Sequence, residues 1–141
     1  MPATFSHAAF AVIALCSFLV TGSQVYAEMI SYRADLKGTT EVPPNDSKGT
    51  GTVDANYDTT SKKLSLTLTY SVLSGPASAA HFHGPAAIGA NASPLVPISG
   101  SLISPIKGDA TLTQAQATDL QSGLSYFNIH TAANRGGELR G

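Results

Sequence analysis

Three histidines carry the clearest chemical signal in this sequence. His81 and His83 form an H-x-H pair in the segment AAHFHGP, and His130 ends the segment YFNIH. In a β-strand, residues i and i+2 point to the same face, roughly 6.5–7 Å apart along the chain. If the two segments are neighbouring strands, the three imidazoles converge and leave an open position on a bound ion. The pattern therefore predicts a metal site with His81, His83 and His130 as ligands.

The preferred metal follows from the type of ligand. Imidazole suits copper and zinc, and the Irving–Williams order favours Cu(II) over Zn(II) at a nitrogen-rich site. Copper is therefore the preferred ion and zinc the second possibility. Each ring would need a partner for its other nitrogen. Asn128, Thr131 and Glu138 are the nearest polar candidates in the sequence.

The alternative is that these histidines bind no metal and are surface or strand-packing residues. An H-x-H pair alone is a weak signal, because it also arises by chance. Alternation adds weight, since Phe82 lies between the paired histidines, while Phe127 and Ile129 alternate with His130. Each segment then has an apolar face for the core and a polar face that carries the histidines.

Other catalytic chemistry is sparse. The sequence has no G-x-S-x-G motif, and no nucleophile can be paired with a general base. Glu138 and Arg140 lie two residues apart in a predicted last strand and share a face, so ion pairs are expected there. An anionic ligand on Arg140 is the alternative. An enzymatic role consequently ranks behind metal binding.

Composition argues against one large class of partners. Charged residues make up 12% of the chain, and its formal net charge is -1. A nucleic-acid-binding domain would show clustered Lys and Arg, whereas Lys62-Lys63 is the only adjacent basic pair. We therefore expect no nucleic-acid partner.

Residues 1–27 differ from the rest and are typical of a signal peptide. Residues 8–20 form an apolar run that is short for a membrane span, and small or apolar residues precede a cleavage site after Ala27. Cleavage leaves one domain, residues 28–141, with no stable membrane insertion and a periplasmic or secreted location. It also removes Cys16, the only cysteine, which excludes thiolate ligands and disulfides. The alternative is an uncleaved anchor.

The remaining residues show the pattern of short strands. Residues 64–72 alternate strictly between apolar and polar side chains, which is typical of a strand with one face in the core. Thr113 and Gln116 fit the capping box of one short helix that ends near Gly123. Many short strands separated by Gly- and Pro-containing turns predict an antiparallel sandwich or barrel.

Four motifs in order resemble the CHRD domain, a family named from chordin and found in exported bacterial proteins. They are LKGTTEVPP (36–44), AHFHGPA (80–86), YFNIHT (126–131) and GGELRG (136–141). One departure is Arg135, where the family often has Pro. The resemblance implies an all-β fold, an antiparallel Greek-key β-sandwich of immunoglobulin-like or Cu,Zn superoxide dismutase-like shape. The histidines also resemble the copper ligands of those dismutases, but no bridging histidine or zinc ligand set is present, so dismutase activity is not implied.

Three hypotheses for function follow. The first is an exported protein that binds a transition metal, preferably copper, through His81, His83 and His130 for storage, delivery or sensing. The second is a structural or adhesive module that binds another exported protein without metal. The third is a metalloenzyme that uses the open coordination position. The metal hypotheses require three imidazoles within reach of one ion, whereas the interaction module predicts separated histidines.

Overall fold

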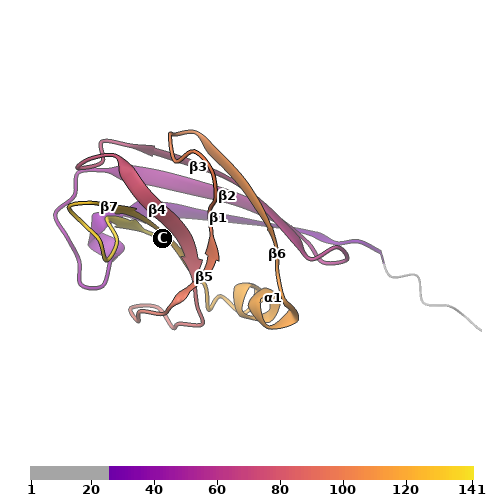
Figure 1. The fold of residues 1–141 in the computed structure, drawn as a ribbon. Coiled ribbons are helices and arrows are strands. Elements are labelled where there is room, and N and C mark those ends of the chain that lie inside the picture. Colours follow the sequence, from indigo (N-terminus) through magenta and orange to yellow (C-terminus); the bar gives the residue numbers. More distant parts are fainter. Residues whose placement is uncertain (1–25) are drawn as a thin grey trace, which may run out of the picture.

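A single antiparallel sheet organises the chain. The computed structural model describes residues 26–141, in which eight strands have the order β5-β4-β7-β8-β1-β2-β3-β6 (Figure 1). The strands are β1 (Met29–Lys37), β2 (Thr50–Asp58), β3 (Lys63–Ser71), β4 (Ala77–His83), β5 (Pro94–Pro97), β6 (Ile106–Thr111), β7 (Tyr126–Thr131) and β8 (Leu139–Arg140). A 3-10 turn, η1 (Gly38–Thr40), and a helix, α1 (Gln114–Gln121), complete the described elements. The predicted all-β fold with one short helix is confirmed.

Local sequence signals locate individual elements well. The alternating run predicted as a strand is β3, where Leu64, Leu66 and Leu68 are buried and the residues between them face outward. The capping box at the start of α1 is also confirmed. Gln116 N–H donates to the Thr113 hydroxyl at 3.2 Å, and Thr113 N–H donates to the Gln116 side chain at 2.8 Å.

The predicted signal peptide falls almost wholly outside the described residues. Residues 1–25, which include Cys16, belong to the part of the chain that the structure does not describe. Cleavage after Ala27 therefore stays a prediction. Within residues 26–141, no helix is both long enough and apolar enough to cross a membrane.

The core lies where the sheet curls over on itself. In Figure 1, β4 and β7 lie across the part of the sheet that contains β1, β2 and β3. Buried apolar side chains from both parts meet in the core, and they include Leu36, Val53, Tyr57, Leu64, Leu68, Phe82, Ile106, Phe127, Ile129 and Leu139. The two layers of the predicted sandwich are thus parts of one hydrogen-bonded sheet that nearly closes into a barrel.

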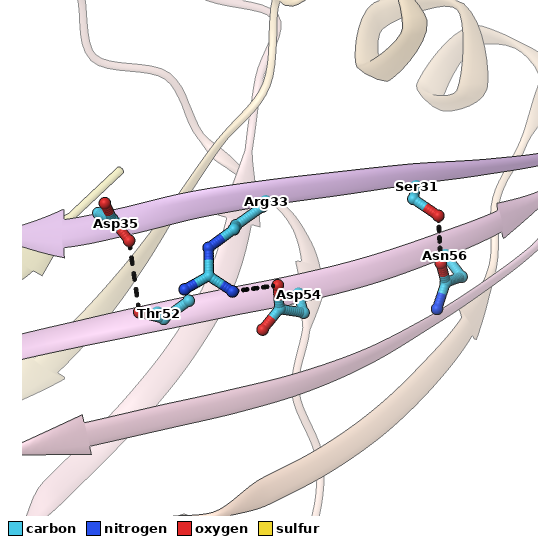
Figure 2. A network of polar contacts seen from close by, with 6 residues as sticks. All are labelled: Ser31, Arg33, Asp35, Thr52, Asp54 and Asn56. Carbon is cyan, nitrogen blue, oxygen red and sulfur yellow. Dashed lines mark hydrogen bonds and ion pairs between the residues drawn. The ribbon is translucent and has the colours of Figure 1, made fainter.

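The outer face of β1 and β2 is polar and exposed. Figure 2 shows three cross-strand pairs of directly opposed residues on this face: Ser31–Asn56, Arg33–Asp54 and Asp35–Thr52. The Arg33–Asp54 ion pair spans 2.8 Å, but both side chains are more than half exposed. Such pairs contribute about 0–1 kcal/mol each, so this face supports strand pairing and adds little further stability.

The short strand β8 connects the two parts of the sheet, because it is the strand between β7 and β1. On one side, Phe127 N–H donates to the Gly141 carbonyl at 2.8 Å, and Gly141 N–H donates back to Phe127 at 3.1 Å. On the other side, Lys37 of β1 pairs with Arg140. The last residues of the chain therefore hold the histidine-bearing strands against β1.

Glu138, immediately before β8, is a buried carboxylate with four hydrogen bonds. Its Oε1 accepts from the Ser47 hydroxyl and the Ser74 backbone N–H, both at 2.7 Å. Its Oε2 accepts from the hydroxyls of Ser74 at 2.5 Å and Thr131 at 2.6 Å. Burial by itself would raise the pKa of Glu138, but these hydrogen bonds outweigh it and lower the pKa to about 2. The carboxylate thus ties two loops and the end of β7 to the start of β8.

We expect Glu138→Gln to lower the free energy of unfolding at neutral pH by about 1–3 kcal/mol, because the amide has one acceptor oxygen and turns N–H donors toward other donors. The folded pKa lies below the unfolded value of about 4.3, so the charged carboxylate stabilises the wild type above that pH. This contribution is lost as the pH falls toward 2, and the variant lacks it. Urea unfolding between neutral pH and about pH 2.5 measures both effects.

Asp46→Asn is the matched control, because Asp46 is exposed and makes no side-chain hydrogen bond among the described residues. It should leave stability and its pH dependence unchanged. If Glu138→Gln behaved like this control, the anchoring role of Glu138 would be wrong.

Candidate metal centre

The pairing of β4 with β7 brings the predicted ligands together. The register places Phe82 opposite Phe127 and Ala79 opposite His130. Because the two phenylalanines point into the core, the histidines that alternate with them share the other face of the sheet. The expected convergence of His81, His83 and His130 is therefore observed.

The three rings lie close enough to surround one ion. Ring centres are 4.9 Å apart for His81 and His130, 5.5 Å for His81 and His83, and 5.9 Å for His83 and His130. One nitrogen from each ring lies within 4.8 Å of the other two, and His81 Nδ1 is 3.1 Å from His130 Nε2. Ligand nitrogens of a tetrahedral ion with bonds near 2.0–2.1 Å lie about 3.3–3.4 Å apart. The His81–His130 pair is already close to this distance, and the other separations are up to 4.8 Å.

Backbone carbonyls hold two of the rings in one tautomer. His83 Nδ1 lies 2.9 Å from the Ala92 oxygen, and His130 Nδ1 lies 2.9 Å from the Arg135 oxygen. A carbonyl oxygen only accepts hydrogen bonds, so each Nδ1 carries the proton and each Nε2 of the neutral ring keeps its lone pair. This arrangement is the usual one for metal-binding histidines, whose second nitrogen donates to a carbonyl or carboxylate.

The Nε2 atom of His83 is buried and has no hydrogen-bond partner among the described residues. Leaving a buried polar atom unpaired costs about 1–3 kcal/mol, so native structures rarely contain one without a reason. A positively charged ion between the rings would accept this lone pair. The unpaired atom is therefore the feature of the cluster that points most directly to a ligand.

His81 differs from the other two rings because no backbone group fixes it. It is partly exposed, and its one hydrogen bond in the described part of the chain joins its Nδ1 to His130 Nε2. Since His130 Nε2 carries a lone pair, the proton of this bond lies on His81 in the metal-free protein. To offer Nδ1 to an ion as the third nitrogen, the neutral His81 ring would take the other tautomer, with its proton on Nε2.

Burial disfavours the charged forms of two of the three imidazoles, His81 and His130. Desolvation lowers the pKa of His81, and repulsion from His130 and His83 lowers it further. Desolvation also lowers the pKa of His130, and repulsion from His83 lowers it further. The hydrogen bond to the Arg135 carbonyl acts in the opposite direction and raises this pKa, but it does not outweigh the other two effects. Neutral imidazole is the form that binds metals, so these shifts favour ligand function.

The polar side chains expected to orient the rings have other roles. Thr131 and Glu138 bind each other through the 2.6 Å hydrogen bond described above. Asn128 lies opposite His81 in the β4–β7 register but makes no hydrogen bond to a histidine among the described residues. Main-chain carbonyls, whose positions depend on loop conformation, take the orienting role in place of these candidates.

The ion pairs expected for Glu138 and Arg140 are also not formed within residues 26–141, where Arg33–Asp54 and Lys63–Asp109 are the ion pairs. Hydroxyl groups and a backbone N–H surround Glu138, while Arg140 is buried against the Tyr126 ring, with its Cζ 3.5 Å from the ring centre. Glu138 and Arg140 are therefore close in the sequence, but their side chains contact different parts of the protein.

Tyr126 is a site residue that sequence reasoning missed. Its ring stacks on His83 with 4.8 Å between ring centres and 10° between ring planes. Its position was available from alternation, because Tyr126 and His130 occupy the same face of one strand. The sequence contained no signal for the stacking itself, which depends on the register of β4 against β7.

A second buried carboxyl lies beside Asn128. Burial raises the pKa of Glu41 to about 7, although Arg140 and a hydrogen bond from Asn128 oppose the shift. Gly137 lies against this pair with a φ of 138°, and a Cβ there would collide with the Glu41 carboxyl and the Asn128 amide. Glu41 is outside the group of potential ligands formed by the three histidines. The cluster is thus a nitrogen-only ligand set.

Comparison with known families agrees with the motifs in the sequence. The sequence model of the CHRD domain matches residues 32–141, which include all three histidines. Neither the curated proteins nor the solved structures contain a match to the chain.

In the metal-free protein, we expect the imidazoles of His81 and His130 to titrate below the ordinary value of about 6.5. The unfolded chain then takes up protons at higher pH than the folded one, so the free energy of unfolding falls as the pH drops below about 6.5. His83→Gln removes one source of repulsion and should raise both midpoints. Histidine NMR titrations of the wild type and the variant measure this, and wild-type midpoints above 6.5 would contradict the burial argument.

Proposed function

The chain belongs to the CHRD-domain family, and we propose that this member binds a transition-metal ion, copper by preference, through His81, His83 and His130. The observation that carries the proposal is the buried, unpaired Nε2 of His83 beside two further imidazoles. Two of the three rings already have the Nδ1–H to carbonyl hydrogen bonds that orient metal-binding histidines.

The ligand set favours copper over other divalent ions. Imidazole nitrogens suit copper and zinc, while magnesium and calcium prefer oxygen ligands. Among first-row ions at a nitrogen site, Cu(II) stands at the top of the affinity order, above zinc and nickel. Three nitrogens also leave one position on a four-coordinate ion for water or an exogenous ligand.

The unequal fixing of the rings favours storage or delivery over permanent structural binding. His83 and His130 are held by the main chain, whereas His81 is partly exposed and held only by its neighbour. A loosely held ligand next to solvent is the one that an incoming partner can displace first. The ion would then pass through an intermediate that keeps two protein ligands.

A structural or adhesive module without metal explains less. It gives no role to the convergence of three imidazoles, to the lowered pKa values of His81 and His130, or to the unpaired nitrogen of His83. A metalloenzyme needs a general base or a nucleophile near the open position. No carboxylate or thiolate joins the histidine cluster within residues 26–141. Binding is therefore the function that these residues support best.

We place the protein outside the cytoplasm, on the strength of residues 1–27 in the sequence. The mature chain would begin at Glu28, just before β1. Expression in a bacterium followed by amino-terminal sequencing of the exported fraction tests this. A protein found only in the cytoplasm, with residues 1–27 retained, would contradict the proposal.

We expect the purified protein to bind one copper ion per chain, and the variant His81→Ala/His83→Ala/His130→Ala to lose that binding. Of the single variants, His83→Ala and His130→Ala should weaken binding more than His81→Ala, because they remove the pre-oriented ligands. Loss of a direct ligand should exceed the roughly 10–100-fold effect typical of an outer partner. Isothermal titration with Cu(II), repeated with Zn(II), measures stoichiometry and preference.

The matched control is Asp35→Asn/Asp54→Asn, which removes two exposed carboxylates from the outer face of β1 and β2 (Figure 2). It should bind copper like the wild type. Equal, weak binding by the wild type and the triple-histidine variant would reject the site and favour the interaction module.

A further inference from the structure

We infer that Arg140 is a positioning residue of the histidine cluster, which fixes the His83 ring by holding the loop that orients it. The inference rests on the proposed metal-binding function and assigns a role to a residue outside the ligand set. The loop consists of residues 84–93 between β4 and β5, and we call it the clasp loop.

The clasp loop has little apolar contact to hold it in place. None of residues 85–93 is buried, and the Ile88 side chain is fully exposed. Near the start of the loop, Ala86 N–H donates to the Leu124 carbonyl at 2.9 Å. The later part of the loop carries the carbonyl that His83 needs, and polar contacts must hold that part.

Arg140 supplies two of these polar contacts from β8. Its Nη2 donates to the Ala90 carbonyl at 2.6 Å, and its Nη1 donates to Asn91 Oδ1 at 3.0 Å. The amide of Asn91 donates in turn to the Val42 carbonyl at 2.8 Å. One guanidinium thus fixes two consecutive loop residues, which its rigid fork of donors allows and a lysine ammonium would not match.

The residue that follows is the partner of the His83 ring. The Ala92 carbonyl accepts from His83 Nδ1 at 2.9 Å, while Ala92 N–H donates to the Tyr126 hydroxyl at 3.2 Å. The Tyr126 ring contacts both His83 and the Arg140 guanidinium. Contacts therefore run without a gap from Arg140 through the clasp loop to the metal-facing ring.

Arg140 itself is 5% exposed, and its two hydrogen bonds to the clasp loop are partly buried. Buried hydrogen bonds from a charged donor are stronger than exposed ones and hold geometry better. Removing them frees residues 90 and 91 to move, and Ala92 is then held by its hydrogen bonds with the Tyr126 hydroxyl alone. The acceptor that keeps the proton of His83 on Nδ1 is thereby less firmly fixed. His130 depends on the Arg135 carbonyl in a different turn, so its tautomer should be unaffected.

The test compares Arg140→Met with the wild type. Methionine keeps an unbranched, apolar side-chain stem but removes the guanidinium, with its donors and its contact with the Tyr126 ring. Nitrogen-15 NMR of the metal-free imidazoles should show His83 protonated at Nδ1 in the wild type and a mixture of tautomers in the variant, with His130 unchanged in both. Copper affinity should fall by about 10–100-fold, the usual effect of losing an outer-shell partner.

Asn91→Ala is the second variant, because Asn91 is exposed and its loss leaves the core intact. It should shift the His83 tautomer in the same direction and decides the question if Arg140→Met does not fold. Arg33→Met and Asn56→Ala on the outer face of β1 and β2 are matched controls and should change neither readout (Figure 2).

The two readouts separate the inference from the function on which it rests. An unchanged His83 tautomer in both Arg140→Met and Asn91→Ala overturns the positioning role. If the wild type binds no copper, the proposed function fails, while the tautomer comparison still decides whether Arg140 positions His83.

Discussion

The register between β4 and β7 is the constraint on which the candidate site depends. Side chains alternate between the two faces of a strand, so opposing Phe82 to Phe127 sends both rings into the core and all three histidines to the other face. A slip of one residue would bury histidines and expose the phenylalanines. The hydrophobic core thus specifies the histidine-bearing surface: the energy that fixes the register comes from apolar burial, and the geometry of the imidazoles follows from it.

The carboxyl-terminal residues serve both stability and the site through neighbouring positions. Glu138 is a structural anion, fully paired with hydroxyl and N–H donors, and it joins loops to the start of β8. Arg140, two residues later, is directed toward the clasp loop and Tyr126. Each charge is buried with partners that satisfy it, as buried charges must be. The short strand β8 therefore joins the two parts of the sheet and carries the contacts that reach His83.

The histidine cluster combines rigid and adaptable ligands. Two rings are oriented by main-chain carbonyls from a loop and a turn, and the third lies near solvent with only an imidazole neighbour. Pre-orientation lowers the entropic cost of binding an ion, while the free ring allows exchange. Carboxylates are kept out of the ligand set, and the nearby Glu41 has a pKa raised to about 7 by burial, which reduces its charge. These properties are consistent with the proposed reversible binding of a metal ion.

Local patterns in the sequence were sufficient for the all-β class, for β3, for the capping box of α1 and for the three candidate ligands. Each of these depends on side-chain periodicity or on contacts between residues a few positions apart, which the sequence displays directly. The orienting partners of the histidines could not be read in this way. The carbonyls of Ala92 and Arg135 belong to the main chain, which every residue has, so no residue type marks them. The separate roles of Glu138 and Arg140 were also hidden, because sequence spacing places both on one face but does not reveal which distant loops meet them. Tertiary structure decided these points, since only the folded path of the clasp loop and of β8 brings residues separated by about 50 positions into hydrogen-bonding distance.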